Sequence, residues 1–236
     1  MKKQQLLGQH FLISQSTAKS IVNFAEITKK DTVLEIGTGK GIMIPYLCGT
    51  AKNVISVEKD KELHSQALEK FSKFSNLTLK QGDGFKTDSD FTIFVSNLPY
   101  SESRKAIEWL AQKRFTRGII MVQKEFAEKL VAKSGSKNHK AITVIANYCT
   151  EIKHLMDVKR SDFSPPPKVE SVVLKLTKKE QISKDLVNTI NKLFSYRRKT
   201  LHNVAKQFGI SIDSNKRFED LTNGEIINLA KQINKN

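Results

Sequence analysis

Four consecutive residues, Asn97-Leu98-Pro99-Tyr100, combine two hydrogen-bond acceptors, a rigid proline and an aromatic ring, and they directly follow an apolar stretch. The Asn97 side-chain oxygen and the Leu98 carbonyl can accept both protons of an adenine amino group. Two such hydrogen bonds would localise the lone pair on nitrogen and aim it at a methyl carbon, so that orientation supplies most of the catalysis. Pro99 fixes φ and stiffens the segment, and Tyr100 can stack on a flat base. Taken alone, the tetrapeptide also fits a strand that ends in a proline turn.

A glycine-rich turn, Gly37-Thr38-Gly39-Lys40-Gly41, follows a second apolar stretch and could lie against a nucleoside. Glu58 ends the next strand-like segment, where a carboxylate can accept both ribose hydroxyls of an adenosine. Asp83, in Gly-Asp-Gly, is the candidate acceptor for an adenine amino group, although this tripeptide is more often a simple turn. The glycines follow a G-x-G-x-G pattern instead of the dinucleotide G-x-G-x-x-G, and no P-loop motif is present.

An alternation of strands and helices is predicted to hold these residues in place. Short apolar runs separated by helical patterns indicate a parallel sheet covered on both faces, which is an α/β fold. The expected strands are 32–36, 53–57, 77–80, 92–96 and 118–123, and the expected helices are 16–25, 41–48, 60–74, 102–114 and 124–132. Two later apolar runs, Ala141–Tyr148 and Ser171–Leu176, are predicted to form an antiparallel strand pair at one sheet edge.

The end of the chain is predicted to be a separate helical domain. A charged run at 178–180 marks the boundary, so that residues 1–179 would form the catalytic domain and residues 180–236 a small RNA-binding domain. Thr222 and Glu225 have the spacing of a capping box at a helix start. The expected helices are 183–195, 199–208 and 222–233.

Composition narrows the choice of partners. Forty basic and 24 acidic residues give a net charge of +16, which favours a polyanionic partner, although it also fits a surface that serves solubility. The two cysteines, Cys48 and Cys149, and the five scattered histidines predict neither a disulfide framework nor a metal site. The sequence has no apolar run of membrane-spanning length and no signal-peptide pattern. We therefore expect a cytoplasmic protein with no metal and no membrane partner.

The glycine spacing resembles the first motif of S-adenosylmethionine-dependent methyltransferases, and the tetrapeptide resembles their signature for planar amines. Together with Gly8-Gln9-His10-Phe11-Leu12, these motifs resemble the rRNA adenine N6,N6-dimethyltransferase family. The resemblance implies a Rossmann-like class I methyltransferase sheet, S-adenosylmethionine as methyl donor and small-subunit rRNA as substrate. It also implies donor contacts by His10, Leu12, Gly37, Glu58, Asp83 and Asn97. Without the family, His10 would be interpreted as an exposed residue at a helix entry.

Two further segments carry the resemblance. Phe163 leads a proline-rich segment similar to a family motif, and by resemblance its ring would face Tyr100 across a flipped base. The alternative for Phe163 is a hydrophobic plug. Arg197-Arg198-Lys199 resembles the housekeeping small-subunit branch and predicts a phosphate contact, because cations at a helix start oppose the helix dipole. A solvated basic surface is the alternative for these three residues.

The sequence departs from the family at two places. Ser101-Glu102-Ser103 replaces a usual Asn-Ile-Ser/Thr, and Asn138-His139-Lys140 replaces an aromatic-glycine-basic segment. These departures suggest a divergent or archaeal-like member. The predicted activity is dimethylation of two adjacent adenosines near the 3′ end of small-subunit rRNA by a monomer. The alternatives are a non-catalytic ribosome-assembly factor and a resistance methylase acting on large-subunit rRNA, whereas the glycine spacing disfavours a nicotinamide dehydrogenase.

Overall fold

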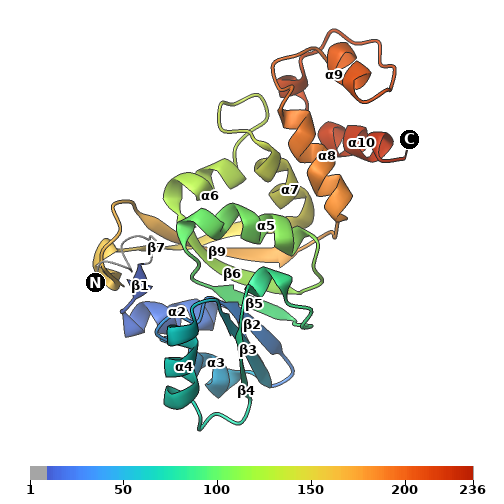
Figure 1. Cartoon of the computed structure of the whole chain (residues 1–236). Helices are drawn as coiled ribbons and strands as arrows, with labels where there is room; N and C mark the ends of the chain where they lie inside the picture. The colour runs from blue at the N-terminus through green and yellow to red at the C-terminus, as the bar shows by residue number, and fades with distance from the viewer. Residues whose placement is uncertain (1–9, 236) are drawn as a thin grey trace. The chain divides into compact units, whose positions relative to one another are not determined.

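A computed structural model describes residues 10–235. Gly8 and Gln9 of the N-terminal motif lie outside this range. The described residues fall into two compact units, one made of residues 10–106, 114–124 and 152–178 and the other of residues 107–113, 125–151 and 179–235. Figure 1 labels the elements along the chain. The first unit contains the sheet, and the second contains the predicted C-terminal helical segment together with residues 125–151.

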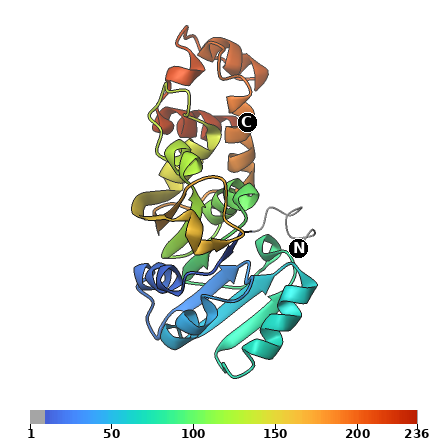
Figure 2. The same cartoon turned by 90° about the vertical axis from the view of Figure 1, so that its left-hand side faces the viewer.

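The first unit is built on a sheet in the order β4-β3-β2-β5-β6-β9-β7. Strands β2 to β6 run parallel, as predicted, and β9 is antiparallel to β6. Figure 2 shows the parallel strands side by side in the blue-to-green part of the chain. The strands are β2 (Thr32–Ile36), β3 (Asn53–Glu58), β4 (Leu77–Gln81), β5 (Ile93–Ser96), β6 (Arg117–Gln123), β7 (Thr150–Val158) and β9 (Ser171–Lys178).

Helices cover the sheet because alternate strand residues are apolar on each face. One core cluster joins Val33, Val54 and Val95 of the strands to Ile21 of α2 and Leu47 of α3. Each of these side chains is less than 3% exposed, which accounts for much of the stabilisation of this unit. The helices of this part of the chain are α2 (Gln15–Phe24), α3 (Ile44–Thr50), α4 (Lys61–Lys70) and α5 (Ser103–Ala111), with short 3-10 turns η1 (Gly84–Lys86) and η2 (Tyr100–Glu102).

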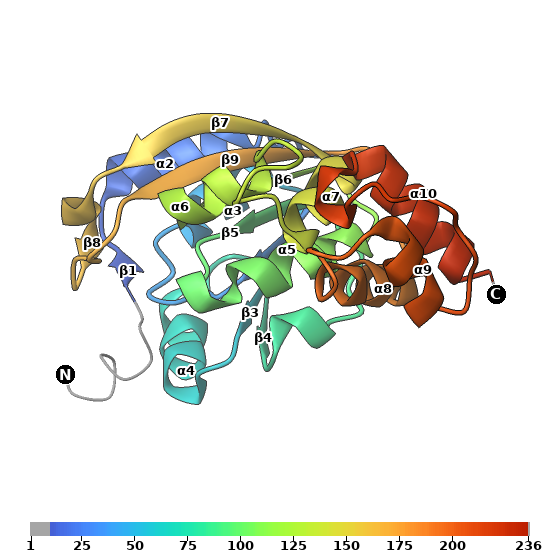
Figure 3. The same cartoon turned by 90° about the horizontal axis from the view of Figure 1, so that it is seen from above.

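Two short strands pair the amino-terminal segment with the proline-rich segment. β1 (Phe11–Leu12) pairs antiparallel with β8 (Phe163–Ser164), and Figure 3 shows the two side by side. A 3-10 turn, η3 (Arg160–Asp162), precedes β8, and the Asp162 carbonyl accepts from the Ile13 amide at 2.7 Å. Segments that lie about 150 residues apart in the chain are thereby joined at one place.

The predicted strand at Ala141–Tyr148 is wrong, because these residues belong to α7 (Ala141–Cys149). Most side chains of this helix are buried, and only Thr143 and Asn147 interrupt its apolar run, which is too few polar residues to reveal a helical period. Thr143 fixes the helix start, since its hydroxyl accepts from the Lys140 amide at 3.0 Å and donates to the Lys129 carbonyl at 2.6 Å. The strand that pairs beside β9 is β7, which begins at Thr150.

Helices make up the rest of the second unit. The helical patterns near 183–195, 199–208 and 222–233 are confirmed, and the Thr222–Glu225 capping box is present. Val187, Ile190 and Ile226 lie in the same buried cluster as α7. The elements are α6 (Lys124–Leu130), α8 (Lys184–Phe194), α9 (Leu201–Gln207), η4 (Phe218–Asp220) and α10 (Asn223–Ile233).

Candidate active site

The candidate site lies where four parallel strands end. β2 leads into the glycine-rich turn, β3 ends at Glu58, Asp83 follows β4, and Asn97 follows β5. Because these strands are parallel, their carboxyl ends meet at one edge of the sheet, the usual ligand position in open α/β sheets. The sheet topology thus brings together residues that are up to sixty positions apart in the sequence.

The glycine-rich turn has a backbone that only glycine adopts easily. Gly37 has φ +86° and Gly39 has φ +55°, both in the left-handed region. The Gly37 amide donates to the Val57 carbonyl at 2.8 Å, and the Gly39 amide donates to Glu58 Oε2 at 2.9 Å. A Cβ atom at Gly39 would lie 3.4 Å from the Phe11 ring. Side chains here would therefore strain the turn and crowd the strand that covers it.

Two buried carboxyls lie behind the turn. Glu58 is 6% exposed, and its Oε1 accepts from the Asp60 amide at 2.9 Å, so backbone donors on both oxygens fix its orientation. Glu35 is 1% exposed and accepts from the Ser56 hydroxyl at 2.5 Å. Burial raises the pKa of Glu35 to about 8; the Ser56 hydrogen bond opposes this rise and the neighbouring Glu58 adds to it. Glu35 is thus a neutral acid at pH 7, whereas Glu58 is an oriented acceptor.

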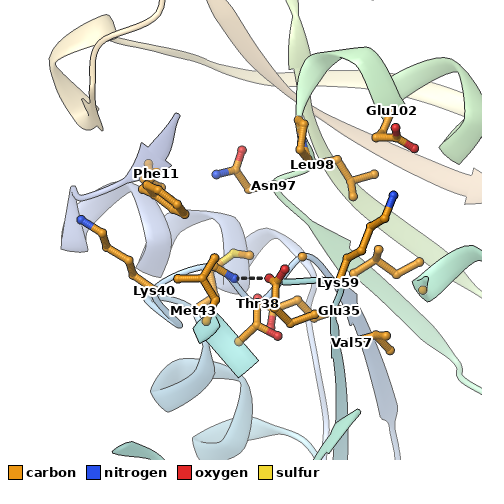
Figure 4. Close-up of a pocket in the computed structure, with 18 of the residues that line it drawn as sticks. Phe11, Glu35, Thr38, Lys40, Met43, Val57, Lys59, Asn97, Leu98 and Glu102 are labelled. Atoms are coloured by element: carbon orange, nitrogen blue, oxygen red, sulfur yellow. Dashed lines mark hydrogen bonds between the residues drawn. The ribbon is translucent and has the colours of Figure 1, made fainter. Parts of the chain in front are cut away.

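A cavity of about 300 Å³ opens between these strand ends and the β1–β8 pair. Its size is at the lower limit of small-ligand sites. Figure 4 shows Phe11 and Lys40 toward one end, Lys59 and Glu102 toward the other, and Asn97 between them. The structure places every predicted donor-binding and catalytic residue on the wall of this cavity: His10, Leu12, Gly37, Glu58, Asp83, Asn97, Leu98, Pro99, Tyr100 and Phe163.

The aromatic side chains of the site differ in their surroundings. The Tyr100 hydroxyl is 2.6 Å from the Ser171 hydroxyl, and the His10 ring stacks on Tyr100 with 5.9 Å between centroids. His10 Nδ1 lies 2.8 Å from the Pro165 carbonyl oxygen, which ties the amino-terminal segment to the proline-rich loop. Phe163 is only 2% exposed and belongs to the core cluster. Its ring thus has a packing role as well as a place on the cavity wall.

Asp83 is held by contacts that the sequence did not indicate. Its Oδ1 accepts from the Phe85 amide at 3.0 Å as the N-cap of η1, and its Oδ2 is 3.1 Å from Lys105 Nζ. Partial burial alone would raise the pKa of Asp83, but the Phe85 hydrogen bond and the Lys105 ammonium outweigh it and lower the pKa. Asp83 is therefore an ionised acceptor at neutral pH.

The three predicted RNA-binding cations lie in the second unit, in the turn before α9. The helix begins at Leu201 with Thr200 as its N-cap, so Arg197, Arg198 and Lys199 precede the helix instead of forming its first turn. Arg197 donates to the Ser136 carbonyl at 2.9 Å and the Lys137 carbonyl at 3.1 Å. It also pairs with Glu219 at 3.3 Å. Arg197 thus has structural contacts of its own, whereas Arg198 is exposed.

Sequence reasoning missed several residues that line the cavity. Phe11 covers the glycine turn, and its place in the Gly-Gln-His-Phe-Leu segment was a signal for it. Met43 and Phe85 add apolar surface, but single apolar residues after a turn carry no distinctive pattern. Lys105 had no signal in the sequence, because a helical lysine is usually solvated.

The residues present fit an adenosyl methyl donor. Buried or oriented carboxylate acceptors, a glycine turn that admits close approach and an apolar wall are the features that a cationic nucleoside requires. Within residues 10–235, no cluster of histidine, cysteine or acidic side chains is arranged to hold a metal ion. Over the same range, no helix has the length and apolar character to cross a membrane. The fold and site define a class I S-adenosylmethionine-dependent methyltransferase.

Comparison with known proteins places the chain within this class. The profile of the ribosomal RNA adenine dimethylase family matches residues 1–235, and the chain belongs to this family. It is 37% identical to ribosomal RNA small subunit methyltransferase A of Thermotoga maritima, over 96% of this chain and 84% of that protein. It is also 34% identical to the probable ribosomal RNA small subunit methyltransferase A of Methanosarcina mazei, over 99% and 95% of the two chains. Bacterial and archaeal relatives thus match to a similar degree.

Solved structures agree with this assignment. A dimethyladenosine transferase from Plasmodium falciparum superposes with a TM-score of 0.80 and 28% identity, covering 96% of this chain and 98% of that one. The 23S rRNA methyltransferase ErmE superposes with a TM-score of 0.66 and 21% identity, covering 95% and 99%. At this identity, the likeness to ErmE shows a shared fold. The family assignment excludes the dehydrogenase alternative.

Proposed function

We propose that this protein transfers methyl groups from S-adenosylmethionine to the N6 atoms of two adjacent adenosines near the 3′ end of small-subunit rRNA, during ribosome assembly in the cytoplasm. The observation that carries the proposal is the position of Asn97-Leu98-Pro99-Tyr100, at the end of β5 and on the wall of a cavity that also holds Glu58 and Asp83. The protein would act as a monomer on the immature small subunit.

Each residue has a distinct part in binding. Glu58, held by two backbone donors, would accept the ribose hydroxyls, and Asp83 would accept from the adenine amino group of the donor. Gly37, Leu12 and His10, which line the same cavity, would contact the rest of the donor. When bound, S-adenosylmethionine supplies an electrophilic methyl carbon with its own leaving group.

The transfer itself depends on orientation of the target amine. Asn97 Oδ1 and the Leu98 carbonyl would accept its two protons, and Tyr100 would stack on the target base. The nitrogen lone pair would form the new N–C bond as the S–C bond breaks and its electrons pass to sulfur, and the excess proton would leave to solvent. No strong base is needed, because the sulfonium is already activated. The second methyl group would follow by the same arrangement after the amine rotates.

Phe163 and the basic turn, residues 197–199, would bind the RNA. The Phe163 ring would form the second face of a slot for the flipped base, opposite Tyr100, which would replace the stacking lost from the RNA. Arg197, Arg198 and Lys199 would contact phosphates; Arg197 also holds the turn through the Ser136 and Lys137 carbonyls and Glu219, and the Lys199 ammonium lies 5.4 Å from the centroid of the Tyr196 ring. The two units would thus divide the work between chemistry and RNA binding.

The proposal is tested by methyl transfer to defined substrates. The purified protein is incubated with radiolabelled S-adenosylmethionine and with immature small subunits, mature small subunits or large-subunit rRNA, and the rRNA is then analysed by mass spectrometry. We expect label in the immature small subunit, as dimethyladenosine at two adjacent positions. Label only in large-subunit rRNA would favour the resistance methylase, and binding to the subunit without label would favour the assembly factor.

A further inference from the structure

Lys105 makes contacts inside the cavity that a surface lysine does not need. Its ammonium lies 3.1 Å from Asp83 Oδ2 and 4.5 Å from the centroid of the Phe85 ring. It is also 3.8 Å from Oε2 of Glu102, which lies three residues earlier, at the end of η2. Lys105, Asp83, Phe85 and Glu102 all line the cavity and all belong to the first unit. One ammonium therefore bridges two carboxylates and covers an aromatic face.

An adenine base in this end of the cavity needs the same two features. Its 6-amino group needs an acceptor, and Asp83 Oδ1 already accepts from the Phe85 amide, so Oδ2 is the oxygen that remains. Its ring needs a flat apolar surface, which Phe85 offers. The Lys105 ammonium uses the Oδ2 atom and lies over the ring. The Lys105 ammonium thus occupies both contacts that a bound adenine base would need, the Asp83 oxygen and the Phe85 ring.

We propose that Lys105 is a specificity-determining residue of the methyl-donor site, whose ammonium competes with the 6-amino group of adenine for Asp83 and moves to Glu102 when the adenine binds. The inference rests on the proposed function, because it takes the ligand to be an adenosyl donor. Only a ligand that supplies its own N–H to Asp83 compensates for the lost ion pair. A purine without the amino group does not compete with the ammonium for Asp83 Oδ2, so the Lys105–Asp83 pair persists when such a ligand binds.

The expected change in ligand affinity is limited by the solvent exposure of the charged side chains. The side chains of Lys105, Asp83 and Glu102 are 50%, 26% and 39% exposed, so solvent weakens each ion pair. Pairs of this kind are weak, and releasing one changes an equilibrium by at most about fivefold. Glu102 reduces the loss further, since it already lies close enough to receive the ammonium. The expected changes in affinity are therefore small but measurable.

The test is a cycle of two proteins and two ligands. Dissociation constants are measured by calorimetry for the unaltered protein and for Lys105→Met, each with S-adenosylhomocysteine and with its analogue that carries hydrogen in place of the purine 6-amino group. We expect Lys105→Met to bind S-adenosylhomocysteine about threefold to fivefold more tightly. The gain for the analogue should be smaller, because the analogue cannot donate to the freed Asp83 oxygen.

Control variants separate this competition from general charge effects. Lys105→Arg keeps a cation beside Asp83 and should bind S-adenosylhomocysteine as the unaltered protein does, to within about twofold. Lys30→Met removes an exposed cation from the turn before β2 and should change neither ligand. Glu102→Gln removes the receiving carboxylate and should weaken S-adenosylhomocysteine binding by about twofold to threefold.

Each outcome decides between alternatives. Weaker or unchanged S-adenosylhomocysteine binding by Lys105→Met overturns the inference, because Lys105 would then assist or ignore the ligand. An equal gain for both ligands also overturns it, since the competition would not involve the amino group. If Glu102→Gln binds S-adenosylhomocysteine as the unaltered protein does, the proposed move of the Lys105 ammonium to Glu102 is overturned. If the unaltered protein binds neither ligand, the proposed function itself fails and the inference with it.

Discussion

The Tyr100 hydroxyl and the Ser171 hydroxyl lie 2.6 Å apart, which joins the turn after β5 to the first residue of β9. Ser171 is 1% exposed, so this hydrogen bond is well protected from water. It holds the phenol at its far end, while His10 stacks against the ring. The ring that is proposed to carry the target base is therefore fixed before the base arrives, which lowers the entropy lost on binding.

The role of this hydrogen bond can be separated from that of the ring. Tyr100→Phe keeps the ring but leaves the Ser171 hydroxyl without its partner, and we expect about 1 kcal/mol lower stability and a modest loss of methylation. Tyr100→Ala removes the stacking surface, and we expect RNA methylation to fall by about tenfold or more. Unfolding in urea and initial methylation rates measure the two effects. Equal methylation by both variants would contradict the stacking role.

Asn97 provides the sharpest test of the chemistry. Asn97→Ala removes an acceptor for the amine protons, and we expect methylation to fall by roughly 10²-fold or more, since misorientation by a small distance has that effect. S-adenosylhomocysteine binding should stay measurable, because Glu58 and Asp83 remain. Asn97→Asp keeps an acceptor oxygen and should retain more activity than Asn97→Ala. Parallel loss of binding and activity in Asn97→Ala would contradict the assigned role.

The pH dependence of stability tests the buried acid Glu35. Its pKa in the folded protein is raised to about 8 from an ordinary value of 4.5, so the folded state binds a proton that the unfolded state releases between these pH values. This contribution is fully present below pH 4.5 and is lost as the pH rises through about 8. Compared with the unaltered protein, Glu35→Gln should gain stability at pH 9 relative to pH 5, by at most on the order of 4 kcal/mol.

The measurement is urea unfolding of both proteins from pH 5 to pH 9. Gln has the shape of the neutral acid and can still accept from the Ser56 hydroxyl, so the variant isolates the charge. Stability curves that run parallel over this range would contradict a neutral Glu35 in the folded protein.

Salt dependence tests the basic turn. Replacing Arg197 and Arg198 together by Met should lower the slope of log affinity against log salt for rRNA by about 1.5, as expected for the loss of two phosphate contacts. Because Arg197 also binds the Ser136 and Lys137 carbonyls, a thermal melt must accompany the measurement. A matched variant with Lys19 and Lys30 replaced by Met removes the same charge from exposed positions elsewhere. An unchanged slope for the arginine variant would place this turn outside the RNA interface.

Sequence alone determined much of the sheet and of the site. β2 has the predicted bounds Thr32–Ile36, because short apolar runs ended by glycine leave little freedom in where a buried strand stops. Since parallel strands end at one edge of the sheet, the sequence predicts that residues such as Glu58 and Asn97 lie close together. The structure places both on the wall of one cavity.

Tertiary structure decided what local pattern could not. Residues 141–149 are mostly apolar and could form a buried strand or a buried helix; packing against α8 and α10, together with the Thr143 hydrogen bonds, selects the helix. The ammonium of Lys105 lies on Asp83 because the turn after β4 and the start of α5 meet in space, which no spacing in the sequence encodes. Local pattern fixes where most elements form, whereas the type of a mostly apolar element and the contacts between distant side chains depend on how the elements pack.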